Sequence, residues 1–550
     1  MTRFSLAACT GLLALTLGAR VAAAQHQHAA AGHAGPATLL EGLGNYSHPI
    51  ATKNAEAQKF FDQGLTLVYG FNHDEAIRAF EQAARLDPHS PMPHWGIALA
   101  LGENINSPID PERAARAYTE LQQAQKLAAN GSAVERGYVE ALSKRYTSDP
   151  KADPKPLAQA YAAAMKSLMA SYPDDLDLAT LYAESMMDLR PWQLWSNDGK
   201  PAEGTLEIVQ VLESVMARNP LHPGANHYYI HAVEASATPE RALPSAQRLE
   251  SLVPAAGHLV HMPAHIYIRT GDYDAAAYRN EVAADVDRKY IAASKPTGLY
   301  PLMYYTHNLD FIGAAADMQG AYARAEKAAR QAATHVEPFA KDMPMVEAFL
   351  IKPVLIQLHF ARWDDVLAAP APAADRMIEQ AYSHYARAVA SAAKKDFEKA
   401  DAELKSLSES VKKVPEDVPL GNNTAGKVMP LLEKTATGRV ALAHGQQDAA
   451  IAALQQAVAL QDALQYDEPP AFHYPVRESL GAALLRAGKA AEAEAVFRDD
   501  LARNRRSGRS LFGLWQSLKA QHKDDAAELV RHQYEAAWKG ADATLNLDAF

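Results

Sequence analysis

Cysteine is almost absent from this sequence of 550 residues, since Cys9 is the only one. It lies within the first 24 residues, which have the pattern of a secretory signal, so the processed chain would contain none. Disulfide bonds, thiolate metal ligands and a cysteine nucleophile are therefore excluded from that mature chain. Packing alone must hold the fold together, and any metal site must use histidine, aspartate and glutamate.

Excess positive charge and familiar catalytic motifs are also missing. The chain has 54 Lys and Arg against 65 Asp and Glu, a net charge of -11, and no basic cluster interleaved with aromatic residues. We therefore expect no nucleic-acid binding. HExxH, a phosphate-binding glycine loop, GxSxG and the dinucleotide fingerprint do not occur, and Tyr-Tyr-Ile separates His227 from His231. No motif identifies a reaction.

Beyond the N-terminus the sequence has no apolar run of about 18 residues, the length that a membrane-spanning helix needs. Residues 1–24 read as a signal peptide, with Arg3 at its positive end, the apolar run Leu6–Leu17 and the small residues Ala22–Ala24 at the cleavage site. The sequence thus predicts a soluble periplasmic or secreted protein without stable membrane insertion. Lipidation of Cys9 is not expected, because almost no apolar run precedes it.

The segment that follows, residues 25–55, is predicted to be flexible. It begins QHQHAAAGHAGPA and carries His26, His28 and His33. Two interpretations stay open for it, an unstructured leader or a weak metal-scavenging tail of the kind that histidine-rich tracts often form.

An internal repeat organises the rest of the chain. Residues 57–90 read AQKFFDQGLTLVYGFNHDEAIRAFEQAARLDPHS. Gly64 and Ala76 are small enough for two antiparallel helices to approach closely, Phe80 fills the gap to the next repeat, and Pro88 stops the second helix. At these positions the segment resembles the tetratricopeptide repeat.

The same frame recurs through most of residues 57–540, and further copies begin at Leu176, Pro223, Gly257, Thr306, Leu431 and Tyr474. The resemblance, to exported tetratricopeptide-repeat proteins of the bacterial type, implies an all-α fold, a superhelical α-solenoid of helix-turn-helix repeats. We predict one array over 56–370 and a C-terminal array over 371–550, with a break at 368–375. Two insertions interrupt the pattern, at 190–204 and 405–430, and the second is predicted to be a long loop.

Histidine is concentrated on one stripe of three neighbouring repeats. In this family the first helix of each repeat turns positions 2, 5, 9 and 12 toward the concave groove. In the copies from Pro223, Gly257 and Thr306 these twelve positions hold six histidines, where simple proportion predicts about half of one. The histidines are His227, His231, His258, His261, His265 and His307. The same stripe carries Glu234, Asp310 and Asp317, and in the preceding copy Asp177 and Glu184.

Histidines three or four positions apart on a helix lie about 5–6 Å apart at Cβ and can share one metal ion. We therefore predict a transition-metal site, with zinc, copper and iron not distinguished by the sequence. Its predicted ligands are His227, His231, Glu234, His258, His261, His265, His307 and Asp310.

Three functional hypotheses follow from this pattern. The first is a metal-binding or metal-handling protein of the cell envelope. The second is a metal-dependent enzyme in which Glu184 or Glu234 is the catalytic base or a ligand. The third is a metal-free scaffold whose groove binds a protein or peptide partner. Trp192 and Trp195, in the first insertion, could either cover one end of the groove or pack locally. The sequence does not specify the substrate or the oligomeric state.

Overall fold

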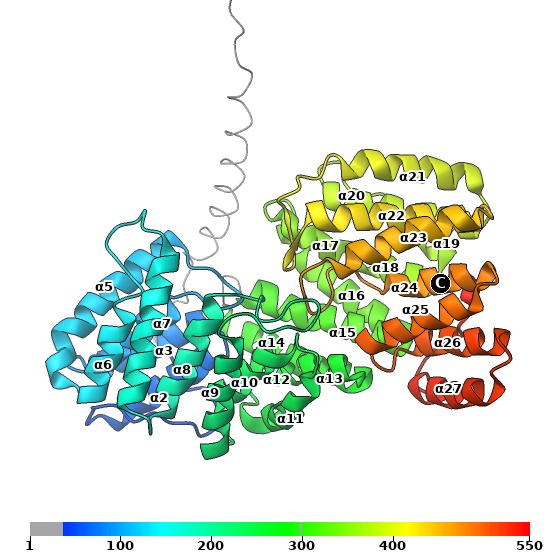
Figure 1. Cartoon of the computed structure of the whole chain (residues 1–550). Coiled ribbons are helices and arrows are strands. Elements are labelled where there is room, and N and C mark those ends of the chain that lie inside the picture. Colours follow the sequence, from blue (N-terminus) through cyan, green and yellow to red (C-terminus); the bar gives the residue numbers. More distant parts are fainter. Residues whose placement is uncertain (1–36, 297–299) are drawn as a thin grey trace, which may run out of the picture. The chain divides into compact units, whose positions relative to one another are not determined.

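The structure, a computed structural model, describes residues 37–296 and 300–550 (Figure 1). The predicted signal peptide and His26, His28 and His33 lie outside these residues. The described chain is helical apart from one small hairpin and two isolated bridges, as predicted for an all-α repeat protein. It forms two compact units, which we call the N-terminal unit (37–270 with 282–287) and the C-terminal unit (271–281 with 288–550). Helix α14 (Tyr273–Ser294) contributes residues to both.

Helix pairs of tetratricopeptide-like architecture build the N-terminal unit. The helices are α2 (Ala55–Tyr69), α3 (His73–Leu86), α4 (Met92–Ala100), α5 (Pro111–Leu127), α6 (Ala133–Leu142), α7 (Pro154–Ser171), α8 (Leu176–Asp188), α9 (Thr205–Arg218), α10 (Pro223–Val233), α11 (Leu243–Leu252), α12 (Gly257–His261) and α13 (Pro263–Thr270). Short 3₁₀ turns lie at Ala128–Asn130 and Pro239–Ala242. Consecutive helices pack against each other in space.

Close helix approach explains why the repeat residues recur. Phe80, on α3, is fully buried between two first helices. A Cβ atom added to Gly64 on α2 or to Gly96 on α4 would lie 2.6 Å from the Phe80 ring. A glycine on each neighbour is thus what lets the aromatic ring fill the gap, which confirms the role predicted for Phe80.

Contacts between first helices fill the interior of the N-terminal unit. Helix α2 packs against α4 and also against α10, which is far away in the sequence. Residues that the repeat frame predicts to face the concave groove, among them His227 on α10 and Glu184 on α8, are buried.

The segment before α2 is packed in its described part, although the sequence predicts flexibility through residue 55. Tyr46 donates its hydroxyl to Asp177 Oδ1 at 2.7 Å, and His48 Nδ1 lies 2.7 Å from Asp177 Oδ2. Gln63 of α2 accepts from the backbone N–H of Leu40. Hydrogen bonds to buried polar residues hold this segment in place. The repeat pattern is one of apolar and small residues, so it does not predict these polar contacts.

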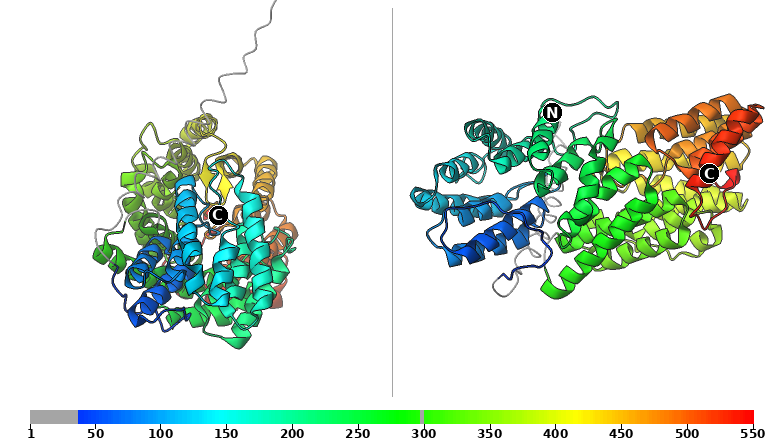
Figure 2. Two further views of the ribbon diagram at one scale, coloured as in Figure 1. Left: turned by 90° about the vertical axis from the view of Figure 1, so that its left-hand side faces the viewer. Right: turned by 90° about the horizontal axis from the view of Figure 1, so that it is seen from below.

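Antiparallel pairs continue through the C-terminal unit, where Figures 1 and 2 show them side by side in yellow to red. Its helices are α15 (Tyr305–Gln319), α16 (Tyr322–Val336), α17 (Glu347–Leu350), α18 (Lys352–His359), α19 (Trp363–Ala368), α20 (Met377–Ala393), α21 (Phe397–Val411), α22 (Ala425–Ala443), α23 (Gln447–Asp462), α24 (Val476–Arg486), α25 (Ala490–Arg503), α26 (Gly508–Ala520) and α27 (Asp524–Ala537). A π-helical turn precedes α15 at Tyr300–Tyr304, and 3₁₀ turns lie at Glu337–Phe339, Pro344–Val346 and Leu547–Ala549.

Two sequence expectations fall within this unit. The predicted break at 368–375 lies between α19 and α20, which pack against each other. The long loop predicted over 405–430 is wrong in extent, because α21 runs to Val411 and α22 begins at Ala425. Between them strands β1 (Pro419–Leu420) and β2 (Asn423–Thr424) form an antiparallel hairpin. The polar composition of the segment concealed the helix ends. None of the described helices combines the length and the apolarity needed to cross a membrane.

The glycine–aromatic packing can be tested in the C-terminal unit. An alanine at Gly481 of α24 would overlap the buried ring of Phe497, whereas the nearest atom to an alanine at Gly313 of α15 is 3.8 Å away. We expect Gly481→Ala to lower the free energy of unfolding by about 1–3 kcal/mol, the cost of overpacking. Gly313→Ala should raise it by roughly 0.5–1 kcal/mol, because alanine favours the helix. Urea unfolding of both variants measures this, and equal changes would contradict the packing role.

Candidate metal centre

Five of the six predicted histidines come together in the interior of the N-terminal unit. His227 and His231 lie on α10, while His258, His261 and His265 lie on α12 and α13. Each is at most 5% exposed. Pro263 cannot donate a backbone hydrogen bond, and the first helix of this repeat is broken there into α12 and α13.

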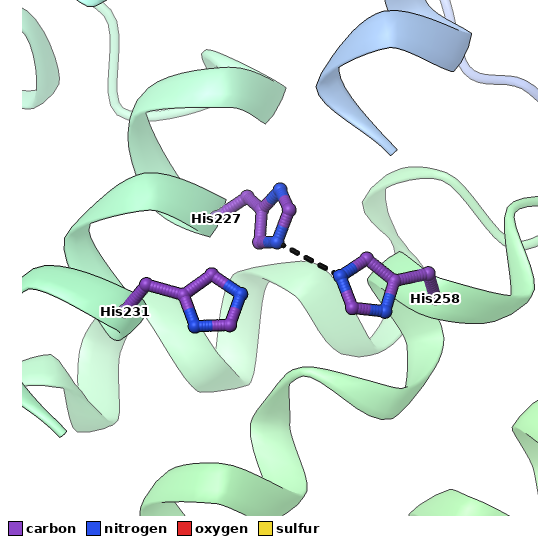
Figure 3. Close-up of side chains that lie close together, drawn as sticks. All are labelled: His227, His231 and His258. Carbon is purple, nitrogen blue, oxygen red and sulfur yellow. Dashed lines mark hydrogen bonds between the residues drawn. The ribbon is translucent and has the colours of Figure 1, made fainter. Parts of the chain in front are cut away.

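Three of these imidazoles form a compact group. The potential ligand nitrogens of His227, His231 and His258 lie within 4.8 Å of one another. The Nε2 atoms of His227 and His258 are 3.1 Å apart, and Figure 3 shows the three rings converging from two chain segments. Three imidazoles around one point form a common ligand set for a transition-metal ion.

Hydrogen bonds fix the orientation of two of these rings. His227 Nδ1 lies 2.6 Å from the carbonyl oxygen of Tyr69, which can only accept, so the ring donates from Nδ1. His231 Nδ1 donates in the same way to Glu234 Oε1 at 2.6 Å. In their neutral forms both rings therefore carry the lone pair on Nε2. Among the described residues, His231 Nε2 is buried and has no hydrogen-bond partner.

Glu234 connects this group to a second pair of imidazoles. Its other oxygen, Oε2, accepts from His265 Nδ1 at 2.5 Å. His265 Nε2 lies 2.7 Å from His261 Nε2, so one of these two nitrogens donates to the other. One buried carboxylate thus orients a histidine on α10 and a histidine on α13, as carboxylates beside metal-binding histidines often do.

Burial keeps several of these groups in the protonation state that suits metal binding. Burial, together with the neighbouring His231, lowers the pKa of His227 well below its ordinary value. Burial and His227 do the same to the pKa of His258, and burial lowers that of His231 against the effect of Glu234. Burial alone would raise the pKa of Glu234, but His265 and His231 lower it to about 2. Neutral imidazoles beside an ionised carboxylate are the form that binds a cation.

Two aromatic rings enclose the group. The ring centroid of Phe71 lies 4.6 Å from that of His227 and 5.3 Å from that of His258, and Trp192 meets His231 edge-on at 5.4 Å. Trp195 donates from Nε1 to the carbonyl oxygen of Ala232 at 2.7 Å. The first insertion therefore lies against the imidazoles and is fastened to α10. Phe71 and Trp192 both have positive φ angles (55° and 60°), a conformation that non-glycine residues adopt at a cost.

The other predicted site residues belong to other helices. His307 and Asp310 belong to α15 of the C-terminal unit, where Asp310 forms an ion pair with Lys352 at 3.0 Å. Glu184 lies on α8, and the charges that act on it are those of Arg145, Asp188 and Glu103 rather than those of the histidines.

A second polar group surrounds Asp177, which the repeat frame places on the same stripe, but sequence reasoning missed its partners. His48, Asp175 and Asp177 are close enough to hold an ion. Asp177 already accepts from Tyr46, Tyr69 and His48, and it lies 3.3 Å from His222 Nε2. Burial would raise the pKa of Asp177, but hydrogen bonds from His222 and His48 hold it well below its ordinary value. Saturated in this way, the carboxylate is a structural anchor. Tyr46 and His48 precede the repeats, so the repeat frame could not find them.

Glu234→Gln tests the role of the bridging carboxylate. An amide can accept on one side only, so one of the two imidazole N–H groups would lose its acceptor. We expect the free energy of unfolding to fall by about 1.5–3 kcal/mol, the range for hydrogen bonds to a charged group. The matched control is Glu213→Gln, whose side chain is 41% exposed and should change stability by less than about 0.5 kcal/mol. Urea unfolding of metal-free protein compares them, and similar losses would argue against the bridge.

No family model matches the chain, and no curated protein matches it. Among solved structures, a human IFIT1 dimer with m7Gppp-AAAA is 14% identical with a TM-score of 0.33, covering 88% of this chain and 91% of that chain. Yeast Tom70 is 11% identical with a TM-score of 0.30, covering 87% and 90%. Likeness at these scores carries no inference about function.

Proposed function

We propose that this protein binds a transition-metal ion through His227, His231 and His258, and that it is an exported metal-handling protein of the cell envelope. The observation that carries the proposal is the orientation of His227 and His231. A backbone carbonyl and a carboxylate hold their Nδ1 protons, so that both Nε2 atoms lie beside His258 within one buried group. A fixed tautomer with Nε2 available is the arrangement that metal-binding histidines require.

The chemistry of the donor set supports a soft or borderline divalent ion. Imidazole nitrogen suits zinc, copper and iron, and the mature chain has no thiolate to compete. Because His227 Nε2 accepts, the hydrogen bond between His227 and His258 needs a proton on His258 Nε2. Binding of an ion through His258 Nε2 therefore requires the other tautomer of this neutral ring, with its proton on Nδ1. Binding should weaken as the pH falls, because a protonated imidazole cannot bind an ion.

The enclosure of the three histidines favours a role in holding a metal ion over a role in catalysis. Phe71 and Trp192 cover the group, and all three histidines are buried. A catalytic metal keeps a coordination position open to water or substrate. The proposal that the protein is exported is supported by the signal-like pattern of residues 1–24.

Metal content tests the proposal directly. Chelator-treated full-length protein is loaded separately with zinc, copper and iron, desalted, and measured by inductively coupled plasma mass spectrometry. We expect the wild type to retain an ion, and the variants His227→Ala, His231→Ala and His258→Ala to lose it. His89→Ala, at an exposed histidine of the same unit, is the control that should retain it. A wild type that stays metal-free under every loading condition would disprove the proposal.

Metal removal should also lower stability, because an ion that binds only the folded state stabilises it. At a metal concentration about 100-fold above Kd, the free energy of unfolding should rise by about 2.7 kcal/mol, and chelation should reverse the gain. Urea unfolding with and without the ion measures this. In His231→Ala the ion should have no effect, whereas an equal gain in that variant would place binding elsewhere.

A further inference from the structure

One imidazole of the C-terminal unit lies between two buried carboxylates. His359, at the end of α18, has its Nδ1 atom 2.8 Å from both carboxylate oxygens of Asp317 on α15. Its Nε2 atom lies 2.9 Å from Oε2 of Glu478 on α24. The three side chains are only 2% or 3% exposed. An ionised carboxylate can only accept hydrogen bonds, so the ring of His359 is the donor on both sides.

This arrangement requires two protons on the group of three side chains. A neutral imidazole has a single N–H, so it can donate to Asp317 or to Glu478 but not to both. The second proton either makes the ring an imidazolium or stays on the carboxyl group that then donates to the ring. The number of protons is two in both cases, so it follows from the hydrogen-bond geometry.

Charges around His359 determine how firmly the second proton is held. Burial and the charge of Arg509 on α26 lower the pKa of His359, but Asp317 and Glu478 outweigh them, so this pKa lies above its ordinary value. With the second proton bound, the imidazolium and the guanidinium of Arg509 balance the two carboxylates. Without it, one negative charge would stay buried and uncompensated, which is costly.

Other titratable groups lie close but do not donate to Glu478. The ring of Tyr474 stacks on His359 with the centroids 4.6 Å apart. Burial and the charge of His359 lower the pKa of His473 well below its ordinary value, so that ring stays neutral. Burial and the charge of Glu478 raise the pKa of Asp500, on α25, to about 7.

Charged groups on α16, α17, α19 and α20, the other helices that pack against α18, are exposed or have partners of their own. The partnered groups are Arg324 with Glu281, Arg330 with Glu326, His335 with the Pro301 carbonyl, Glu347 with backbone N–H groups of α20, Asp364 with Lys394, Asp365 with Arg362, Glu379 with Arg376, and His384 and Arg387 with Glu403. His359 is therefore the donor on which the two carboxylates depend.

The contact between His359 and Glu478 joins helices that are 119 residues apart in the sequence. The end of α15 meets the last part of the chain in the same unit, because a Cβ added to Gly320 would overlap the ring of Trp538. Glu478 is the weaker side of the junction, since its other oxygen, Oε1, has no partner among the described residues. If the second proton leaves, Glu478 faces the lone pair of a neutral ring and has no donor at all.

We propose that His359 is a pH-sensitive latch of the C-terminal unit. While the three side chains hold two protons, the ring ties α18 to α15 on one side and to α24 on the other. In alkaline solution the second proton passes to solvent, the hydrogen bond to Glu478 breaks, and α24 is released from α18. The latch does not involve the candidate metal centre, which belongs to the N-terminal unit.

Hydrogen exchange followed by mass spectrometry tests the latch on the full-length protein, with the protection factor of α24 amides measured from pH 6.5 to pH 9. The contribution of a histidine whose folded-state pKa is raised is present in full below its ordinary pKa, about 6.5, and is lost as the pH rises through the folded-state pKa. We expect protection to fall by about tenfold for each pH unit over this window. Asp500 acts at lower pH, because its stabilising effect is lost below and up to about pH 7.

Glu478→Gln removes the need for the second proton but keeps the contact. The amide nitrogen of the new side chain can donate to Nε2 of a neutral His359, while Nδ1 still donates to Asp317. Protection of α24 in this variant should therefore stay constant from pH 6.5 to pH 9 and should exceed that of the wild type at pH 9. His359→Gln can donate on one side only, so it should show low protection of α24 at every pH.

The matched controls are Glu492→Gln and His532→Gln, whose side chains are 58% and 62% exposed and should leave the pH dependence of the wild type unchanged. Circular dichroism at pH 6.5 checks that each variant is folded. Constant protection of α24 in the wild type between pH 6.5 and pH 9 would overturn the proposal. So would a decline in Glu478→Gln as steep as that in the wild type.

Discussion

The carboxylate of Glu234 is the group on which the candidate metal centre depends. Each of its oxygens accepts one imidazole N–H, from His231 on α10 and from His265 on α13. Without an acceptor on both sides, two buried donors would be left unpaired in the core, at a cost of about 1–3 kcal/mol each. Because Glu234 stays ionised, it also favours a positive charge nearby, whether a proton or a metal ion.

Hydrogen bonds in the interior of the N-terminal unit connect the candidate metal centre to the helices around it. Tyr69, at the end of α2, accepts from His227 through its carbonyl and donates its hydroxyl to Asp177 on α8. Asp177 in turn holds the segment that precedes the repeats, through Tyr46 and His48. A change in this anchor would therefore be felt at His227, although no residue of the anchor is a proposed ligand. Polar networks of this kind give a core one preferred arrangement.

Much of the fold followed from local sequence. The glycine and aromatic positions of residues 57–90 predicted a close helix pair, and Phe80 fills the gap between Gly64 and Gly96. The histidine stripe predicted which residues of α10, α12 and α13 would meet. The repeat frame did not predict the burial of this stripe, which follows from the packing of α2 against α10. The repeat period relates neighbouring helices, and it does not predict a contact between α2 and α10, which are far apart in the sequence.

The sequence by itself determined the helical repeat, the presence of a single cysteine, Cys9, and the identity of the imidazoles that gather in the N-terminal unit. These depend on spacing and composition, which local physics converts directly into helices and faces. Only the tertiary structure decided which nitrogen of His227 and His231 carries the lone pair, which carboxylate orients them, and that Glu184 belongs to a separate cluster with Arg145. Those outcomes depend on partners such as the backbone carbonyl of Tyr69. Every residue has a backbone carbonyl, so the sequence cannot mark this one, and only the folded chain brings it within hydrogen-bond distance of His227.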